Sequence, residues 1–173
     1  MTDSILMKSI TLKRLREQFG DAVLDVVEFR GEITVTVAKD KILDVLRWMK
    51  EGRGEGFNFL ADLCGADYPE RDERFEVVYN LLNMHNGERI RIKTRVAEGD
   101  SIASVTPLWE AANWMEREAF DMYGIHFIGH PNLIRILMFD GFEGYPLRKD
   151  FPVKGLESPE ERYAADDPRR NEA

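Results

Sequence analysis

Three carboxylates lie within six residues of one predicted helix: Glu116, Glu118 and Asp121. Paired carboxylates can act as the acid and the base of a hydrolase, but the two groups of a glycosidase face each other about 5 Å or more apart, usually from different elements. Here the acids share one short stretch with Trp114 and Arg117, which is typical of an ion-pair network. We therefore interpret them as structural or interface residues. A free-standing carboxylate hydrolase that uses Glu116 and Glu118 as a stable, active monomer is the less favoured alternative.

Two histidines, His126 and His130, have the i,i+4 spacing that presents two metal ligands on one face of a helix. Gly124, Gly129 and Pro131 interrupt any helix through them, and no cysteine or third histidine nearby completes a zinc-binding set. We expect no metal here. His126 is expected to pack, and His130 to be a turn residue that hydrogen-bonds the backbone or a partner.

The glycines Gly52, Gly54 and Gly56 could suggest a phosphate-binding loop. Such a loop follows a strand and opens a helix, whereas this run follows a predicted helix and leads into a predicted strand. The single cysteine, Cys64, excludes a disulfide within the chain, and one thiol cannot hold an iron–sulfur cluster, which takes about four cysteines or their histidine substitutes. We expect no cofactor on this chain.

Charge and hydropathy exclude two further classes of protein. A formal net charge of −8, from 24 basic and 32 acidic residues, argues against nucleic acid as the main partner. The apolar patch at residues 5–7 is too short for a signal peptide, and no apolar run approaches the roughly 20 residues that cross a bilayer. We expect a cytoplasmic chain that reaches a membrane only through other proteins.

Helix and strand periods alternate along the first two thirds of the chain. Leu12, Leu15 and Phe19 have helical spacing, while Ile33 and Val35 alternate with threonines as in a strand. The predicted helices are 10–19, one after Asp40 that ends at Gly52, and one between Pro107 and Gly124, and the predicted strands are 23–29, 32–37, 57–64, 74–84 and 88–97. This order predicts an α+β fold: a two-layer domain with a mainly antiparallel five-stranded sheet and helices on one side.

Local rules give the ends and the pairings of two helices. Asp40 is a predicted cap, and Thr106 with Pro107 predicts the start of the third helix, which Gly124 ends. Arg117 is expected to pair with Asp121 at the i,i+4 spacing, which leaves the two glutamates to find partners downstream.

One predicted strand has a wholly basic face, formed by Arg89, Arg91, Lys93 and Arg95. The favoured interpretation is the solvated outer face of an antiparallel sheet. The alternative is a surface on which an acidic neighbour docks.

The segment 125–152, which we name the strap, is interrupted by glycines and prolines yet rich in large apolar residues. An irregular segment of this composition must bury its aromatic side chains, so we expect it to bind a partner. Arg148, Lys149 and Asp150 are expected to pair with charges across that interface. The predicted organisation is a compact domain at 1–124, the strap at 125–152 and a charged, mobile tail at 153–173.

Two motifs carry a resemblance to a known family. The run from Glu116 reads E-R-E-x-F-D-M-Y-G-I-x-F-x-G-H-P-x-L-x-R-I-L, and E-G-x-P-L-R-K-D-F-P follows it. With Trp114 and residues 64–69 before them, these motifs resemble the C subunit of proton-pumping NADH:quinone oxidoreductase, respiratory complex I. Ile134 departs from the family's usual basic residue, and Tyr145 from its usual histidine or tryptophan.

The resemblance implies a non-catalytic scaffold in the peripheral arm of this translocase, at the cytoplasmic face of the membrane. FMN and iron–sulfur clusters would belong to sister subunits, the D subunit would be the direct partner, and the B and I subunits would lie nearby. An equivalent subunit of a membrane-bound hydrogenase or of another quinone-reducing dehydrogenase is the alternative. The residues expected at the partner interface or in the family motif are Trp114, Glu116, Arg117, Glu118, Asp121, His130, Pro131, Arg135, Tyr145, Pro146, Arg148, Lys149 and Asp150.

Overall fold

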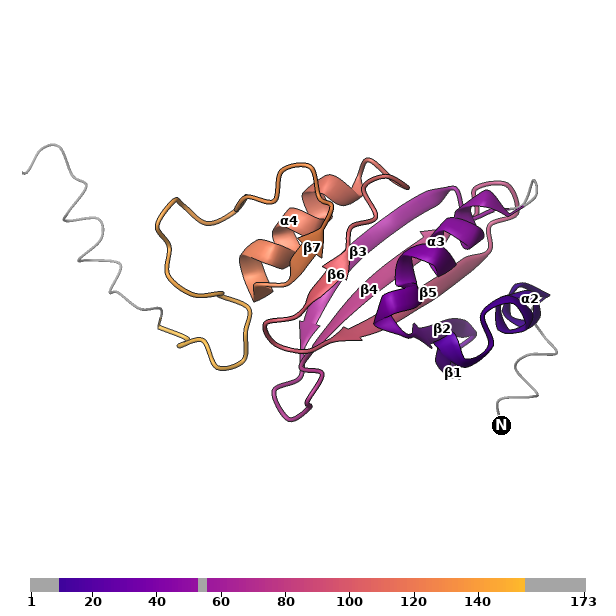
Figure 1. Cartoon of the computed structure of the whole chain (residues 1–173), viewed down its shortest axis with the longest axis horizontal. Coiled ribbons are helices and arrows are strands. Elements are labelled where there is room, and N and C mark those ends of the chain that lie inside the picture. The colour runs from indigo at the N-terminus through magenta and orange to yellow at the C-terminus, as the bar shows by residue number, and fades with distance from the viewer. Residues whose placement is uncertain (1–9, 53–55, 155–173) are drawn as a thin grey trace, which may run out of the picture.

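The structure is a computed structural model that describes residues 10–52 and 56–154 (Figure 1). Three α-helices, two short 3-10 helices and seven strands follow one another along these residues. In order they are α2 (Ile10–Phe19), η1 (Gly20–Ala22), β1 (Val23–Phe29), β2 (Glu32–Val37), η2 (Lys39–Lys41), α3 (Ile42–Glu51), β3 (Phe59–Asp67), β4 (Phe75–Leu82), β5 (Arg89–Val96), β6 (Ser101–Ala103), α4 (Ala112–Tyr123) and β7 (His126–Ile128).

The main sheet has five strands in the order β1-β2-β5-β4-β3. Only β2 and β5 run parallel, and the other three pairs are antiparallel. The buried side chains of α2, α3 and α4 join one core with the inward face of this sheet. The predicted α+β fold, with a mainly antiparallel five-stranded sheet and helices on one side, is confirmed.

Alternation along the strands builds the core. In β5, Ile90, Ile92 and Val96 point inward, and they lie opposite the buried residues Leu81, Tyr79 and Phe75 of the neighbouring β4. Each such side chain contributes roughly 1.5–3 kcal/mol when it is fully buried, so the inward face supplies most of the stability of the sheet. The opposite face of β5 carries its basic side chains.

A second, two-stranded sheet pairs β6 with β7 in parallel and was not predicted. Three residues are too few for alternation to mark a strand. The small sheet nevertheless extends the core past Gly124, because Ile102, Ile125 and Phe127 are all buried in it. The first residues of the strap are therefore part of the packed domain.

Two predicted helix starts are wrong, although the predicted ends at Gly52 and Gly124 hold. Asp40 lies inside η2, and α3 begins two residues later without a side-chain cap. α4 begins at Ala112, because the backbone N–H groups of Leu108 and Trp109 donate to the Val105 carbonyl and form a tight turn first. No helix of the described residues is long and apolar enough to cross a membrane.

Candidate functional site

The strap follows an irregular path beside α4 after β7 (Figure 1, orange). It is half-exposed along most of its length and carries a series of large apolar side chains that remain open to solvent. These exposed side chains, which we name the apolar ridge, are Ile128 (67%), Ile134 (52%), Leu137 (61%), Phe139 (50%) and Leu147 (48%). An accumulation of this kind on one segment marks a protein-binding surface more often than a bare solvent face.

Asp121, a fully buried residue of α4, organises the first half of the strap. Its Oδ2 accepts the consecutive backbone N–H groups of residues 136–138 at 3.0, 2.8 and 2.9 Å. Its Oδ1 accepts Nη1 of Arg135 at 2.8 Å. Burial by itself raises the pKa of Asp121, but these four donors outweigh it and hold that pKa below its ordinary value. The carboxylate is therefore ionised and committed to the strap.

Arg135 continues this network across the strap. Its Nη2 donates to the Gly144 carbonyl at 3.0 Å, and its guanidinium lies 5.3 Å from the ring of Tyr145 and 5.7 Å from the ring of Phe142. Phe142 in turn packs against Phe151 with ring centroids 5.9 Å apart. A cation over aromatic faces adds directional attraction to burial. Arg135 thus ties together parts of the strap that are about ten residues apart.

A second buried carboxylate, Asp67 at the end of β3, holds the last part of the strap. It accepts Nε of Arg74 at 2.7 Å and Nη2 at 3.0 Å, and it also accepts the backbone N–H of Lys149 at 2.7 Å. Arg74 extends to Asp150 at 2.8 Å and to Glu98 at 3.0 Å. The hydrogen bond from Arg74 lowers the pKa of Asp67, against the opposing effect of burial.

Arg148 also binds its own chain. It donates to the Tyr123 carbonyl at 2.7 Å, pairs with Glu98, and lies 4.4 Å from the ring of Tyr145. Arg148 and Asp150 therefore both bind charged groups of their own chain, and their pairing with charges of a partner stays a prediction. Lys149 contributes its backbone N–H, and its side chain is exposed.

Glu116 is fully buried on the opposite side of α4. Its carboxylate accepts the Ser104 hydroxyl at 2.7 Å and the backbone N–H of Val105 at 2.6 Å. The expected downstream partner is therefore wrong, because Glu116 contacts the segment after β6 and not the strap. Burial raises its pKa to about 7, although both hydrogen bonds act in the opposite direction.

The predicted Arg117–Asp121 pair is not formed. Arg117 donates to the carbonyls of Ile134 and Arg135, each at 3.1 Å, and its guanidinium lies 5.2 Å from the ring of Trp114. Trp114 itself is 62% exposed, and Arg117 connects it to the backbone of Ile134. Helix spacing allowed the ion pair, but the strap supplied better partners to both side chains.

The histidines behave as their surroundings suggested. Nε2 of His130 lies 3.1 Å from the Asn113 carbonyl and its Nδ1 accepts the Asn132 N–H at 3.0 Å, so His130 is a turn residue bonded to backbone. His126 packs edge-on against Phe120, with 5.2 Å between ring centroids. No cluster of metal-ligating side chains occurs in residues 10–52 and 56–154.

Three other predicted residues lie at or near the surface. Glu118 and Pro131 are exposed, and Pro146 is half-buried on the strap.

The sequence did not predict the roles of Asp67, Arg74 and Glu98, which bind the strap from the ends of the strands. Their separation from it, 82 residues between Asp67 and Lys149, left no local pattern to read. The tail from 155 onward lies outside the described residues.

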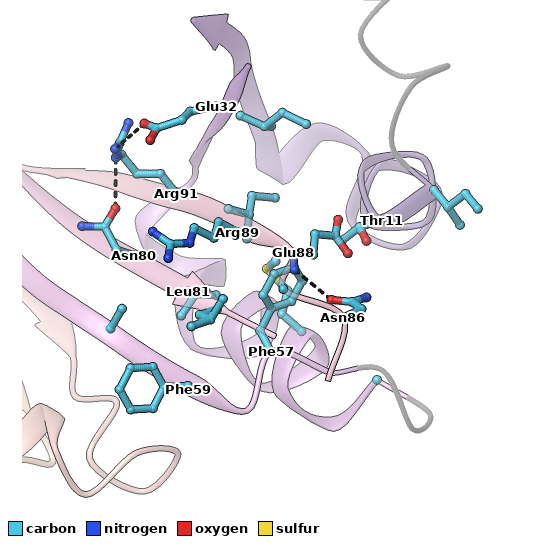
Figure 2. A pocket seen from close by; sticks show the side chains of 18 of the residues that line it. Thr11, Glu32, Phe57, Phe59, Asn80, Leu81, Asn86, Glu88, Arg89 and Arg91 are labelled. Atoms are coloured by element: carbon cyan, nitrogen blue, oxygen red, sulfur yellow. Dashed lines mark hydrogen bonds and ion pairs between the residues drawn. The ribbon is translucent and has the colours of Figure 1, made fainter. Parts of the chain in front are cut away.

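The basic face of β5 is largely neutralised within the sheet. Arg91 pairs with Glu32 at 3.0 Å, while Lys93 and Arg95 lie 3.1 and 3.8 Å from Glu76. Arg89 and Arg91 also line an open groove of about 1590 Å³. Figure 2 shows Arg91 bonded to Glu32 and Asn80 there, with Arg89 in the same groove. This pairing favours the outer-face interpretation over a free basic docking surface.

Comparisons with known proteins agree on one family. The family model described as "Respiratory-chain NADH dehydrogenase, 30 Kd subunit" matches residues 35–157. The chain is 51% identical over 143 residues to the C subunit of the NADH-quinone oxidoreductase of Citrifermentans bemidjiense, a match that covers 82% of this chain and 88% of that protein. It is 49% identical over 149 residues to the C subunit of the NADH-quinone oxidoreductase of Roseiflexus sp., which covers 86% of each chain.

A solved structure shares the fold. One chain of the membrane-bound sulfane sulfur reductase, an archaeal respiratory membrane complex, superposes with a TM-score of 0.70 at 28% identity. The match covers 82% of this chain and 84% of that one. The same module therefore occurs in more than one kind of respiratory complex.

Proposed function

Because this chain belongs to the family of the 30 kDa subunit of respiratory-chain NADH dehydrogenase, which is the C subunit of complex I, we propose that it acts as a non-catalytic scaffold in the peripheral arm of that enzyme. Its role is to hold neighbouring subunits in place while they move electrons from NADH to quinone. The closest neighbour is the D subunit, with the B and I subunits nearby. FMN and the iron–sulfur clusters belong to sister subunits, and the chain lies at the cytoplasmic face of the membrane.

The apolar ridge is the observation that carries this proposal. Its side chains project from a segment that Asp121 and Asp67 bind to the domain, and they stay open to solvent. Full burial of one leucine or isoleucine contributes roughly 1.5–3 kcal/mol, and each 1.4 kcal/mol is about a tenfold change in affinity. A few ridge residues are enough for stable retention of a subunit.

The test is affinity purification of the tagged chain from solubilised membranes. We expect homologues of the D, B and I subunits in the eluate, together with NADH-dependent quinone reduction. Replacement of Ile134 and Leu137 by serine should lower their recovery by roughly tenfold or more. The matched control replaces Leu24 and Phe29, which are 56% and 68% exposed on β1, and should retain the subunits. Equal recovery from both double variants would refute the ridge as the docking surface.

The structural match to the sulfane sulfur reductase supports a second candidate: the equivalent subunit of a respiratory complex with another electron donor. The same purification separates the two. Hydrogenase or other oxidoreductase subunits in place of the NADH-oxidising ones would move the assignment to that relative. A lone, active chain would instead support the hydrolase alternative.

A further inference from the structure

We propose that the strap is folded onto the domain before any partner binds, pinned at two points by the buried carboxylates of Asp121 and Asp67. The inference deepens the proposed function and rests on it only in treating the strap as the docking surface. As a consequence, the partner binds an apolar ridge that is already formed, and its binding does not have to order the strap.

The first point is the Asp121 anchor. Three consecutive backbone N–H groups at residues 136–138 converge on one carboxylate oxygen, a concave arrangement that binds anions in proteins. Hydrogen bonds to an ionised acceptor are about twice as strong as neutral ones. Arg135 adds a fourth bond from the strap to the same carboxylate. This anchor fixes the backbone directly, so it fixes the direction in which Leu137 points.

The second point is the Asp67 anchor, at the other end of the strap. The Lys149 N–H and the Arg74 guanidinium share the Asp67 carboxylate, and Arg74 also binds Asp150. Asp67 and Arg74 have 0% and 10% exposed side chains, so the strap adds donors and acceptors to an ion pair that water reaches poorly. An ion pair in such a setting is screened much less than one on the surface.

Between the anchors, the strap packs closely on the C-terminal end of α4. The Leu147 N–H donates to the Met122 carbonyl at 3.1 Å. Gly124 has a φ of +77°, and a Cβ at this position would lie 2.6 Å from the Tyr145 ring. A segment that packs this closely over a glycine and also donates a backbone hydrogen bond to the helix has a defined place on it. All of these contacts are made by the chain to itself.

This arrangement identifies the kind of surface that the partner must offer. The two arginines of the strap are bound inside the chain, since Arg135 binds Asp121 and Arg148 binds Glu98. The large apolar side chains that face outward from the strap include Ile134, Leu137 and Leu147. The fitting partner is therefore a protein with an apolar groove, and acidic residues opposite Arg135 or Arg148 are not required. A preformed ridge also avoids the ordering cost of a disordered segment.

Hydrogen exchange of the free, full-length chain, followed by mass spectrometry, tests the inference. In the wild type we expect the amides of residues 136–138 to exchange at least about 100-fold more slowly than in an unstructured peptide. Asp121→Asn should speed them roughly tenfold, since it weakens charge-assisted bonds. Asp67→Asn should do the same at Lys149. The control Asp44→Asn, at an exposed carboxylate of α3, should change neither region.

Unprotected amides at residues 136–138 in the free wild type would overturn the inference. If Asp121→Asn also deprotects β4 and β5, the domain itself has unfolded, and Arg135→Gln then replaces it, because Arg135 lies on the strap. Unchanged exchange in Arg135→Gln would also count against the anchor. The result is separable from the proposed function: protection with no recovered subunits would refute the scaffold, and recovered subunits without protection would refute the preformed strap.

Discussion

Glu116 shows how one buried carboxylate can make stability depend on pH. Its folded pKa of about 7 lies above the 4.5 of an ordinary glutamate, so the folded chain binds the extra proton between these two values. The contribution of Glu116 to folding stability is therefore fully present below pH 4.5, and it is lost as the pH rises through about 7. Asp121 and Asp67 have the opposite sign, because their lowered pKa values stabilise the fold above the ordinary value of 3.8.

Glu116→Gln isolates the glutamate from these opposing groups. A glutamine can accept the Val105 N–H and donate to the Ser104 hydroxyl, so it keeps both hydrogen bonds without a charge. Relative to the wild type, we expect the variant to gain about 3 kcal/mol of stability as the pH rises from below the ordinary glutamate pKa to above the folded one, and then to stay level. Urea denaturation at a series of pH values measures it. A stability difference that does not change with pH would contradict the raised pKa of the buried Glu116 carboxyl.

Asp121 marks the limit of residue-level prediction from sequence. The i,i+4 rule correctly found that Arg117 could reach it, but the rule compares side chains on one helix only. Three backbone N–H groups of the strap and Arg135 together outcompete one side-chain pair. Their identity depends on how an irregular segment returns to the helix, which no local pattern encodes.

At the scale of elements, the end of α4 and the strap are matched in shape at Gly124. Gly124→Ala would place a Cβ 2.6 Å from Tyr145 at a φ of +77°, whereas Gly129→Ala has a similar φ of +82° and nothing within 4 Å. Both substitutions carry the backbone cost of about 1 kcal/mol. We expect Gly124→Ala to lose about 1–3 kcal/mol more through overpacking. Equal losses in thermal or urea unfolding would show that the strap moves aside freely.

Arg148→Ala tests the other end of the strap. It removes the hydrogen bond to the Tyr123 carbonyl and the stacking on Tyr145, while the sheet keeps its core. We expect limited proteolysis to cleave the strap near residues 145–151 several-fold faster, with a loss of about 1–2 kcal/mol in global stability. Arg148→Lys keeps the charge but not the planar fork, and should give an intermediate rate. If Arg148→Ala is cleaved at the wild-type rate, contacts other than those of Arg148 keep this part of the strap on the domain.

Elements with a long, regular pattern were predictable from sequence, and short ones were not. β1 and β2 were predicted at 23–29 and 32–37, as found, because alternation and a turn define them. The three-residue strands β6 and β7 exist only because they pair with each other, although α4 lies between them in the sequence. The start of α4 was misplaced because proline is common at the first position of a helix, but a proline does not by itself make a helix begin there.

At the scale of the whole molecule, the domain and the strap are joined more closely than a boundary at residue 124 implies. The strap begins as β7 inside the core and later returns to the ends of α4 and β3. The strap's irregularity and its apolar character were predictable from the sequence, and the family resemblance supplied its expected role. The two anchors came only from the structure, since they join residues from distant parts of the chain.

Truncation tests whether the first residues of the strap are part of the packed domain. A chain that ends after Gly124 lacks Ile125 and Phe127, which are 1% and 3% exposed in the core, whereas a chain that ends after His130 keeps both and loses the same anchors. Two buried apolar side chains contribute about 3–6 kcal/mol together, so we expect the shorter chain to be less stable by that amount or unfolded at about 37 °C. Urea denaturation and circular dichroism compare the two. Equal stability would show that the domain is complete at Gly124, and that β7 belongs with the partner-binding segment alone.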